Sequence, residues 1–263
     1  MKKWFLVILA VATFVLGACG EKQEASTQTA LERVEKAGKL VVGTTGNYRP
    51  FSYMDKSNKL TGYDIEWATI IADELGLELE FVTGQFSGLI PGLVAGKFDV
   101  VLSGANATEE RKKSVDFSEF YAKDGAVAVV KKGTTGVSGI EDMEGKIVGV
   151  NAGSAFEEVV KKIGGYKDLK TYPGAAESFA DLIAGRVDFV AIGLPAAAEY
   201  INNSTTGSEI EIIGQPFDEK DIAVAIAKDS DDLLEAINKV IQKKKEDGTF
   251  DDLAMKYFGQ TFQ

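Results

Sequence analysis

The chain has 263 residues, of which 45% are hydrophobic and 26% charged, a composition typical of globular proteins. Its 29 basic and 40 acidic side chains give a formal net charge of −11, which argues against nucleic-acid binding because phosphates require a basic surface. The lack of histidine and the single cysteine exclude His-based general-base catalysis, Cys–His dyads and an intrachain disulfide. They also leave almost no ligands for zinc, so we expect no metal site.

The first 19 residues combine a basic start with an apolar stretch. Lys2 and Lys3 precede an apolar stretch of 13 residues at 4–16, which is shorter than the ~20 residues of a membrane span but suits a secretory signal. Small residues then precede Cys19 (LGAC), as in the lipobox of bacterial lipoproteins. We therefore expect a signal peptide at 1–18 and a lipid on Cys19 that anchors the protein to the outer face of a membrane. The alternatives are an ordinary secretory signal and an uncleaved anchor helix.

After the cysteine the sequence changes from polar to regularly patterned. Residues 19–30 are polar and without periodicity, which predicts a flexible tether. Strand and helix patterns then alternate, with a strand at 39–43, a helix at 63–75 ending at Gly76, a strand at 77–82 and a helix at 86–95 ending at Gly96. This βαβα order predicts a mostly parallel sheet covered by helices.

An internal repeat divides the chain into two halves. Residues 93–104 are matched by class of residue at 182–193, where a helix again ends at a glycine, a basic residue and an aspartate form the turn, and a buried strand follows. Residues 38–43 match 145–150 in the same way. Any two α/β units share some of this pattern, but the length of the match favours two α/β lobes of similar build.

Two apolar runs of small residues, 126–130 and 222–227, each lead into charged residues and are expected to cross between the lobes as hinge strands. Residues 231–258 are expected to form two helices, broken at Gly248, that pack on the first lobe. The resulting boundaries are 31–125 plus 228–263 for lobe one and 131–221 for lobe two.

Ligands of open α/β lobes bind beyond the carboxyl ends of the strands. The loop after the first strand carries Tyr48 and Phe51, whose rings could either form an apolar wall for a ligand or close the core of the lobe. After the strand that ends at residue 102, Thr108 is a plausible N-cap that puts Arg111 in the first helical turn. A cation there opposes the helix dipole. It either pairs with the neighbouring glutamates at 109 and 110, or faces the cleft and binds a carboxylate in bidentate fashion.

In the second half, Ser154 and Glu157 form the S-x-x-E pattern of a capping box after the strand at 145–150. The free N–H groups of this helix N-terminus are also suited to an anion. Neither a Walker A sequence nor a GxGxxG loop occurs, so we expect no nucleotide and no other cofactor.

Taken together, these stretches resemble family 3 of the bacterial extracellular solute-binding proteins over residues 38–260. The similar segments are GTTGNYRPFSY, GYDIEWATIIADELG, FSGLIPGLVAGKFDVVLSGANATEERKKSVDFSEFY, EGKIVGVNAGSAFEE and EDGTFDDLAMKYFG. The resemblance implies the α/β type II periplasmic-binding-protein fold, with an open, mostly parallel sheet and flanking helices in each lobe. It also implies the solute-binding subunit of an ABC importer for amino acids, not an enzyme. The expected partners are a small amino acid-like ligand, an ABC permease and its ATPase, and we expect a monomer.

The resemblance also implies a ligand site by position. Tyr48 and Phe86 would stack on the ligand, and the Gly104 N–H group and Asn106 would donate hydrogen bonds to it. Arg111 would hold its α-carboxylate. The remaining expected site residues are Phe51 and Ser103 in lobe one and Gly153, Ser154 and Ala155 in lobe two.

Two positions depart from the family pattern. Thr45 stands where relatives that bind basic amino acids tend to carry an acidic residue, which disfavours arginine or lysine as ligand. Gly193 stands where the family has an aspartate for the ligand's α-ammonium, and an unpaired buried ammonium is costly. Either another carboxylate such as Asp124 or Asp221 replaces it, or the ligand is not a simple α-amino acid. A dehydratase on the same fold and a sensor that partners a membrane receptor are the alternative functions.

Overall fold

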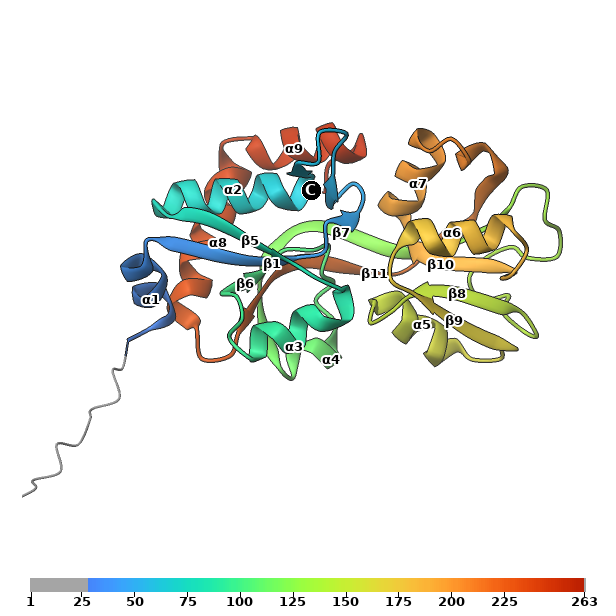
Figure 1. Ribbon diagram of the computed structural model, residues 1–263, viewed down its shortest axis with the longest axis horizontal. Helices are drawn as coiled ribbons and strands as arrows, with labels where there is room; N and C mark the ends of the chain where they lie inside the picture. The colour runs from blue at the N-terminus through green and yellow to red at the C-terminus, as the bar shows by residue number, and fades with distance from the viewer. Residues whose placement is uncertain (1–27, 263) are drawn as a thin grey trace, which may run out of the picture.

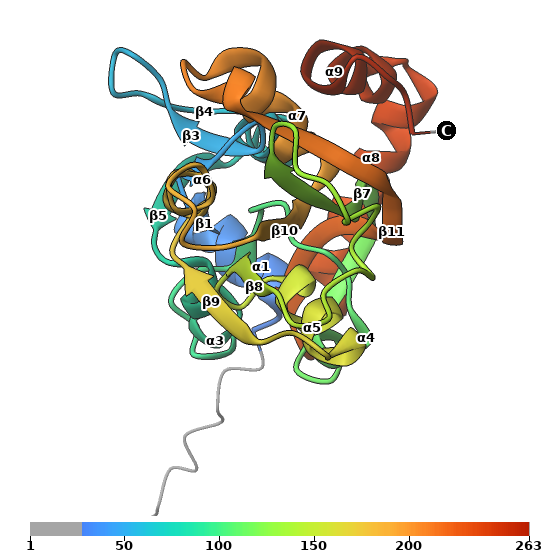
Figure 2. The same cartoon turned by 90° about the vertical axis from the view of Figure 1, so that its right-hand side faces the viewer.

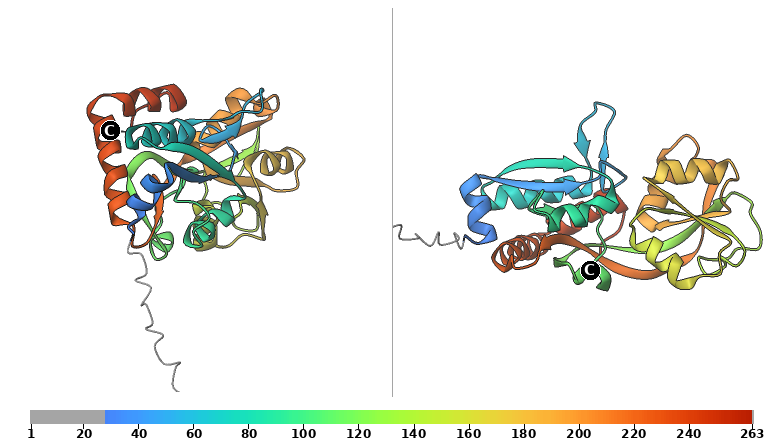
Figure 3. Two further views of the ribbon diagram at one scale, coloured as in Figure 1. Left: turned by 60° about the vertical axis from the view of Figure 1, so that its left-hand side comes forward. Right: turned by 60° about the horizontal axis from the view of Figure 1, so that its bottom comes forward.

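The computed structural model describes residues 28–262, which form two lobes joined by two long strands, β7 (Val115–Lys131) and β11 (Ile210–Ala227) (Figure 1). Both strands run side by side from one lobe to the other (Figure 3). The predicted α/β fold with two crossing strands is therefore confirmed. Among the described residues no helix is long and apolar enough to cross a membrane. The predicted signal peptide, Cys19 and most of the tether lie outside the described residues.

Lobe one is built on five strands in the order β5-β1-β6-β11-β7. β1 is central and parallel to both neighbours, with Val42 opposite Phe81 on one side and Val100 on the other. The strands of lobe one other than β7 and β11 are β1 (Lys39–Thr44), β5 (Glu78–Thr83) and β6 (Val100–Val101). Its helices are α1 (Ala30–Ala37), α2 (Tyr63–Leu75), η1 (Phe86–Gly88), α3 (Leu89–Val94), α4 (Glu109–Lys112), α8 (Asp231–Glu246) and α9 (Thr249–Phe258).

Lobe two repeats this order as β9-β8-β10-β7-β11. The crossing strands exchange places, because β11 lies inside the sheet and β7 at its edge in lobe one, and the reverse holds in lobe two. Its remaining elements are β8 (Ile147–Asn151), α5 (Ala155–Ile163), β9 (Asp168–Tyr172), α6 (Ala175–Ile183), β10 (Phe189–Gly193), α7 (Leu194–Asn203) and η2 (Gly207–Glu209). The repeated sequence segments thus occupy equivalent places, since β1 and β8 match and so do β6 and β10.

Both faces of each half of the sheet are covered by helices. In lobe one, α2, α8 and α9 pack on one face around Tyr63, Trp67 and Phe250, and α3 covers the other. In lobe two, α5 covers one face, and α6 and α7 the other. A small sheet of β2 (Asn47–Tyr48), β3 (Ser52–Met54) and β4 (Leu60–Thr61) projects from lobe one near α6 and α7 (Figure 2).

Glycines end several helices where the sequence predicted it. Gly76 caps α2 in the left-handed conformation with φ 68°, and Gly248, with φ 86°, separates α8 from α9. The helix expected at 86–95 instead starts as the short 3₁₀ turn η1 and continues as α3. At the N-terminal end α1 begins at Ala30, capped by the side chain of Thr29.

The runs expected as hinge strands lie inside the lobes. Residues 126–130 of β7 pack in the two clusters of lobe two, and 222–226 of β11 pack in lobe one. Between them the pairing of β7 and β11 is irregular, with register shifts between Ile213 and Phe217 and between Phe217 and Lys220. This irregular stretch, opposite Asp124 and Ala126, is where we expect the lobes to bend.

Asp64 forms a buried polar link in the core of lobe one. Its carboxylate accepts hydrogen bonds from the Gly104 N–H group (2.8 Å) and the Tyr121 hydroxyl (2.8 Å). Burial is the main cause that raises the pKa of Asp64 to about 7, and the two hydrogen bonds partly offset it. The helix α2 is thereby tied to the loop after β6 and to β7.

The raised pKa of Asp64 predicts a pH-dependent stability. Between about pH 4 and pH 7 the folded protein keeps a proton on Asp64 that the unfolded chain has lost, so the free energy of unfolding falls as pH rises through this window. Asp64→Asn should remove up to about 4 kcal/mol of this pH dependence in urea denaturation. Asp73→Asn, on the exposed face of the same helix, is the matched control. An unchanged pH dependence in Asp64→Asn would contradict the assignment.

Candidate functional site

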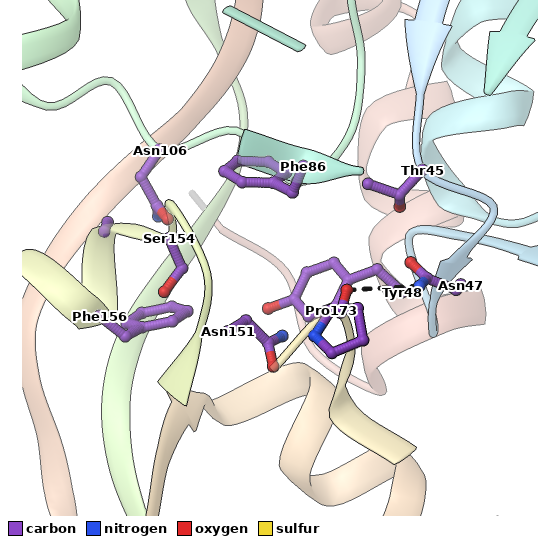
Figure 4. A pocket seen from close by; sticks show the side chains of 11 residues that line it. Thr45, Asn47, Tyr48, Phe86, Asn106, Asn151, Ser154, Phe156 and Pro173 are labelled. Atoms are coloured by element: carbon purple, nitrogen blue, oxygen red, sulfur yellow. Dashed lines mark hydrogen bonds between the residues drawn. The ribbon is translucent and has the colours of Figure 1, made fainter. Parts of the chain in front are cut away.

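A cavity lies between the two lobes, with about 410 Å³ of space free of atoms when the adjoining solvent is included (Figure 4). It lies beyond the carboxyl ends of β1, β8 and β9, which is where the sequence predicted a site. The lining residues are Thr45, Asn47, Tyr48, Phe86, Gly104 and Asn106 from lobe one, and Asn151, Ser154, Ala155, Phe156 and Pro173 from lobe two.

Most of the expected ligand residues meet at this cavity. Tyr48, Phe86, Gly104, Asn106, Ser154 and Ala155 line it, and Arg111 and Gly153 contact each other beside it. Phe51 and Ser103 are fully buried and do not line it. The Ser103 hydroxyl accepts a hydrogen bond from the Thr45 N–H group (3.2 Å), so this serine positions the loop after β1.

Aromatic rings form one wall of the cavity. The Tyr48 ring stacks on Phe51 with centroids 5.3 Å apart and the planes only 10° apart. Phe51 in turn packs on Phe258 of α9 in the core of lobe one, so of the two roles open to it, closing the core is the one it has. Phe86 lies across the cavity from Ser154, in the short turn η1 (Figure 4). Tyr48 and Phe86 are therefore the rings available to a ligand.

Arg111 is a buried cation, with a relative exposure of 7%. Thr108 caps its helix as predicted, and the guanidinium donates to the carbonyls of Asn106 (2.8 Å) and Gly153 (3.0 Å). The neighbouring glutamates 109 and 110 pair with lysines 112 and 113 instead. Burial lowers the pKa of Arg111, and the more distant charge of Glu158 partly offsets this. Within residues 28–262, no carboxylate forms an ion pair with this guanidinium.

The helix α5 presents its N-terminus to the cavity, but the predicted capping box is only half formed. The Ser154 hydroxyl accepts from the Glu157 N–H group (3.2 Å) as predicted. The Glu157 carboxylate, however, accepts from the N–H group of Gly153 (2.7 Å), one residue before the cap. The amides of Gly153 and Gly104, both expected to contact the ligand, are therefore engaged within the protein.

Two amide side chains in the cavity have unused hydrogen-bonding groups. Nδ2 of Asn106 and Oδ1 of Asn151 are buried and have no hydrogen-bond partner among the residues that the structure describes. Buried polar groups are nearly always bonded, so both are available to a bound molecule. The predicted site residues did not include Asn47, Asn151, Phe156 or Pro173. Asn151 and Pro173 lie at the carboxyl ends of β8 and β9, so the rule that ligands bind beyond strand ends points to both.

The lobes touch each other around the cavity. Besides the contact of Arg111 with Gly153, Asn47 donates to the Pro173 carbonyl (3.4 Å) across the lobe boundary (Figure 4). On the outer side, Arg49 and Glu199 lie 3.6 Å apart as an ion pair. A Cβ on Gly153 would lie 2.9 Å from Cα of Ser87. The two lobes are therefore closed on each other in this structure.

Comparisons with known proteins agree with this architecture. The chain is 34% identical to the L-cystine-binding protein TcyJ of Escherichia coli K12, covering 87% of this chain and 86% of that protein. It is also 34% identical to the arginine-binding extracellular protein ArtP of Bacillus subtilis 168, with 98% of each chain covered. The solved structure of an ancestral arginine-binding protein bound to arginine is 41% identical with a TM-score of 0.80, covering 84% of this chain and 99% of that one.

These three relatives are named for binding, in keeping with the prediction that the chain is not an enzyme. The predicted function as the solute-binding subunit of an ABC transporter, at the extracytoplasmic side, is confirmed by the same relationships. The family pattern itself matches residues 40–260. The chain belongs to the bacterial extracellular solute-binding proteins, family 3.

Proposed function

We propose that this solute-binding protein captures an α-amino acid with an uncharged side chain, and that Arg111 holds its α-carboxylate. The observation that carries the proposal is the buried guanidinium of Arg111, which has no anionic partner in the described part of the chain. Such a charge is costly unless a bound group neutralises it, and the planar donors of arginine match a carboxylate.

The other contacts follow from the cavity. The rings of Tyr48 and Phe86 provide its apolar walls, and the free amide groups of Asn106 and Asn151 provide one donor and one acceptor. The N-terminus of α5, behind Ser154, contributes a favourable dipole for the carboxylate. Because Asn106 and Asn151 belong to different lobes, ligand binding stabilises the closed arrangement.

The side chain of the ligand is constrained by the lining of the cavity. None of the 11 lining residues is acidic or basic. A guanidinium or ammonium on the ligand side chain would therefore lack an ionic partner there, which agrees with Thr45 disfavouring a basic ligand. Relatives named for cystine and for arginine both exist, and the neutral lining favours an uncharged side chain such as that of glutamine over arginine and over cystine, whose second half carries a further ammonium and carboxylate.

A calorimetric titration of the refolded protein with the 20 common L-amino acids and L-cystine tests this choice. Refolding removes any solute that copurifies. We expect an uncharged side chain to give the lowest Kd, and L-arginine and L-lysine to bind at least about tenfold more weakly. L-Arginine as the tightest ligand would contradict the neutral site, and no binding across the panel would contradict the proposal of an amino acid.

Substitution of Arg111 tests the carboxylate contact. Arg111→Ala should weaken binding of the best amino acid by about 100-fold or more, because its carboxylate would lose a buried charged partner. Arg111→Lys keeps the charge but not the fork of donors, and should recover only part of the affinity. Arg33→Ala, which removes an exposed cation of α1 within lobe one, is the control. A Kd for Arg111→Ala within about threefold of the native value would refute the role.

We further propose that cleavage before Cys19 and lipidation of this residue keep the protein at the outer membrane face, where a permease with its ATPase receives the solute. This rests on the basic, apolar and small-residue order of positions 1–19. Lipid attachment would retain the domain near the transporter while the tether allows it to turn.

Expression in a bacterial host tests the anchor. The native protein should partition into detergent and carry the added mass of a lipid, whereas Cys19→Ser should lose both properties. Native protein that carries no lipid would contradict the lipobox. If Cys19→Ser stayed in the membrane, an uncleaved N-terminal helix would be the anchor instead.

A further inference from the structure

The backbone conformation of Gly193, at the junction of β10 and α7, does not require a glycine. Its φ of −65° and ψ of 140° are accessible to any residue. A Cβ at this position would overlap Oδ2 of Asp124 and lie 2.7 Å from its Cγ. The carboxylate of Asp124, from the crossing strand β7, therefore fills the space in which a side chain at 193 would lie.

Asp124 is buried, with a relative exposure of 4%, and no side chain within residues 28–262 forms a hydrogen bond with its carboxylate. Hydrogen-bonding interactions with the backbone amides of Gly125 and Leu194 lower its pKa in part. Burial dominates and raises the pKa of Asp124 well above its usual range. The adjacent Lys123 does not compensate this group, because its ammonium lies over the Phe120 ring, 5.1 Å from the centroid.

Asp124 is not one of the 11 residues that line the ligand cavity but lines a separate hollow with Gly125 and Leu194, and its neighbours connect it to the ligand cavity. β10 lies between β7 and β8 in the sheet, and its carboxyl end at Gly193 is next to the end of β8, where Asn151 lines the cavity. The charge of Asp124 also acts on the hydroxyl of Tyr48, which forms the aromatic wall of the same cavity, and helps to raise the pKa of Tyr48.

The other acidic groups near the lobe boundary are already engaged or exposed. Asp64 accepts two hydrogen bonds, and Glu199 pairs with Arg49. Asp221 and Glu219 are exposed. Asp124 is thus the buried carboxyl group at the crossing of the strands that lacks a cationic partner in the described chain, as Arg111 is the buried cation without an anionic one.

We propose that Asp124 binds the α-ammonium group of the ligand, and that Gly193 is a glycine because it makes room for this carboxylate. The inference rests on the proposed function, since it requires an amino acid whose carboxylate is held by Arg111. A zwitterion supplies a carboxylate to the buried guanidinium, and its ammonium group favours the ionised form of the buried Asp124 carboxyl group.

The test uses the tightest-binding L-amino acid of the panel and its analogue with hydrogen in place of the α-ammonium, such as glutaramate for L-glutamine. The native protein should prefer the amino acid by about 100-fold. Asp124→Asn is nearly isosteric and should lose this preference, with an unchanged affinity for the analogue. Asp221→Asn removes an exposed carboxylate from the neighbouring strand and should keep the preference.

A second variant guards against a general loss of structure. The ordinary backbone of Gly193 permits an aspartate once Asp124 is removed, so Asp124→Ala combined with Gly193→Asp should restore the preference to within about tenfold. If Asp124→Asn binds the amino acid as the native protein does, the ammonium contact is refuted while amino acid binding stands. If the native protein binds no amino acid at all, the proposed function itself fails.

Discussion

The two lobes meet at the buried guanidinium of Arg111, for which the described residues supply no anion. The guanidinium donates to one carbonyl in each lobe, so a single side chain connects both sides of the cavity. Neutral carbonyl groups stabilise a buried cation less than a carboxylate does, so a bound carboxylate would add favourable interaction energy at Arg111. Arg111 therefore stabilises both the bound ligand and the closed arrangement of the lobes, so that ligand binding and lobe closure are coupled.

The crossing strand β7 carries Asp124, the acidic group that complements Arg111. β7 carries Asp124 between the cores of the two lobes, and β10, which pairs with β7, ends at the glycine that accommodates it. Because this carboxylate lies on the connecting strand, its position depends less on one lobe than that of Arg111 or Asn151 does. The α-carboxylate of the ligand would thus contact lobe one and its α-ammonium the connecting strand, so ligand binding would depend on the angle between the lobes.

Local sequence patterns predicted the elements well and their partners less well. Apolar periodicity and terminal glycines located α2, α8 and α9, because these features act within a few residues. The role of Phe51 and the partner of Glu157 were decided by contacts with α9 and with Gly153, which local patterns do not contain. The sequence placed Asp64 in a helix but did not predict its buried role, because its hydrogen bonds to Gly104 and Tyr121 join residues 40 and 57 positions apart.

The exchange of β7 and β11 between edge and interior has a consequence for the unity of the molecule. Each lobe completes its sheet with half of both strands, and the backbone hydrogen bonds continue through all eight strands without a break. Lobe two is one continuous segment from β7 to β11, whereas lobe one is assembled from the segments before and after it and borrows both crossing strands. The two lobes can therefore move relative to each other around a solute while both depend on β7 and β11 to complete their sheets.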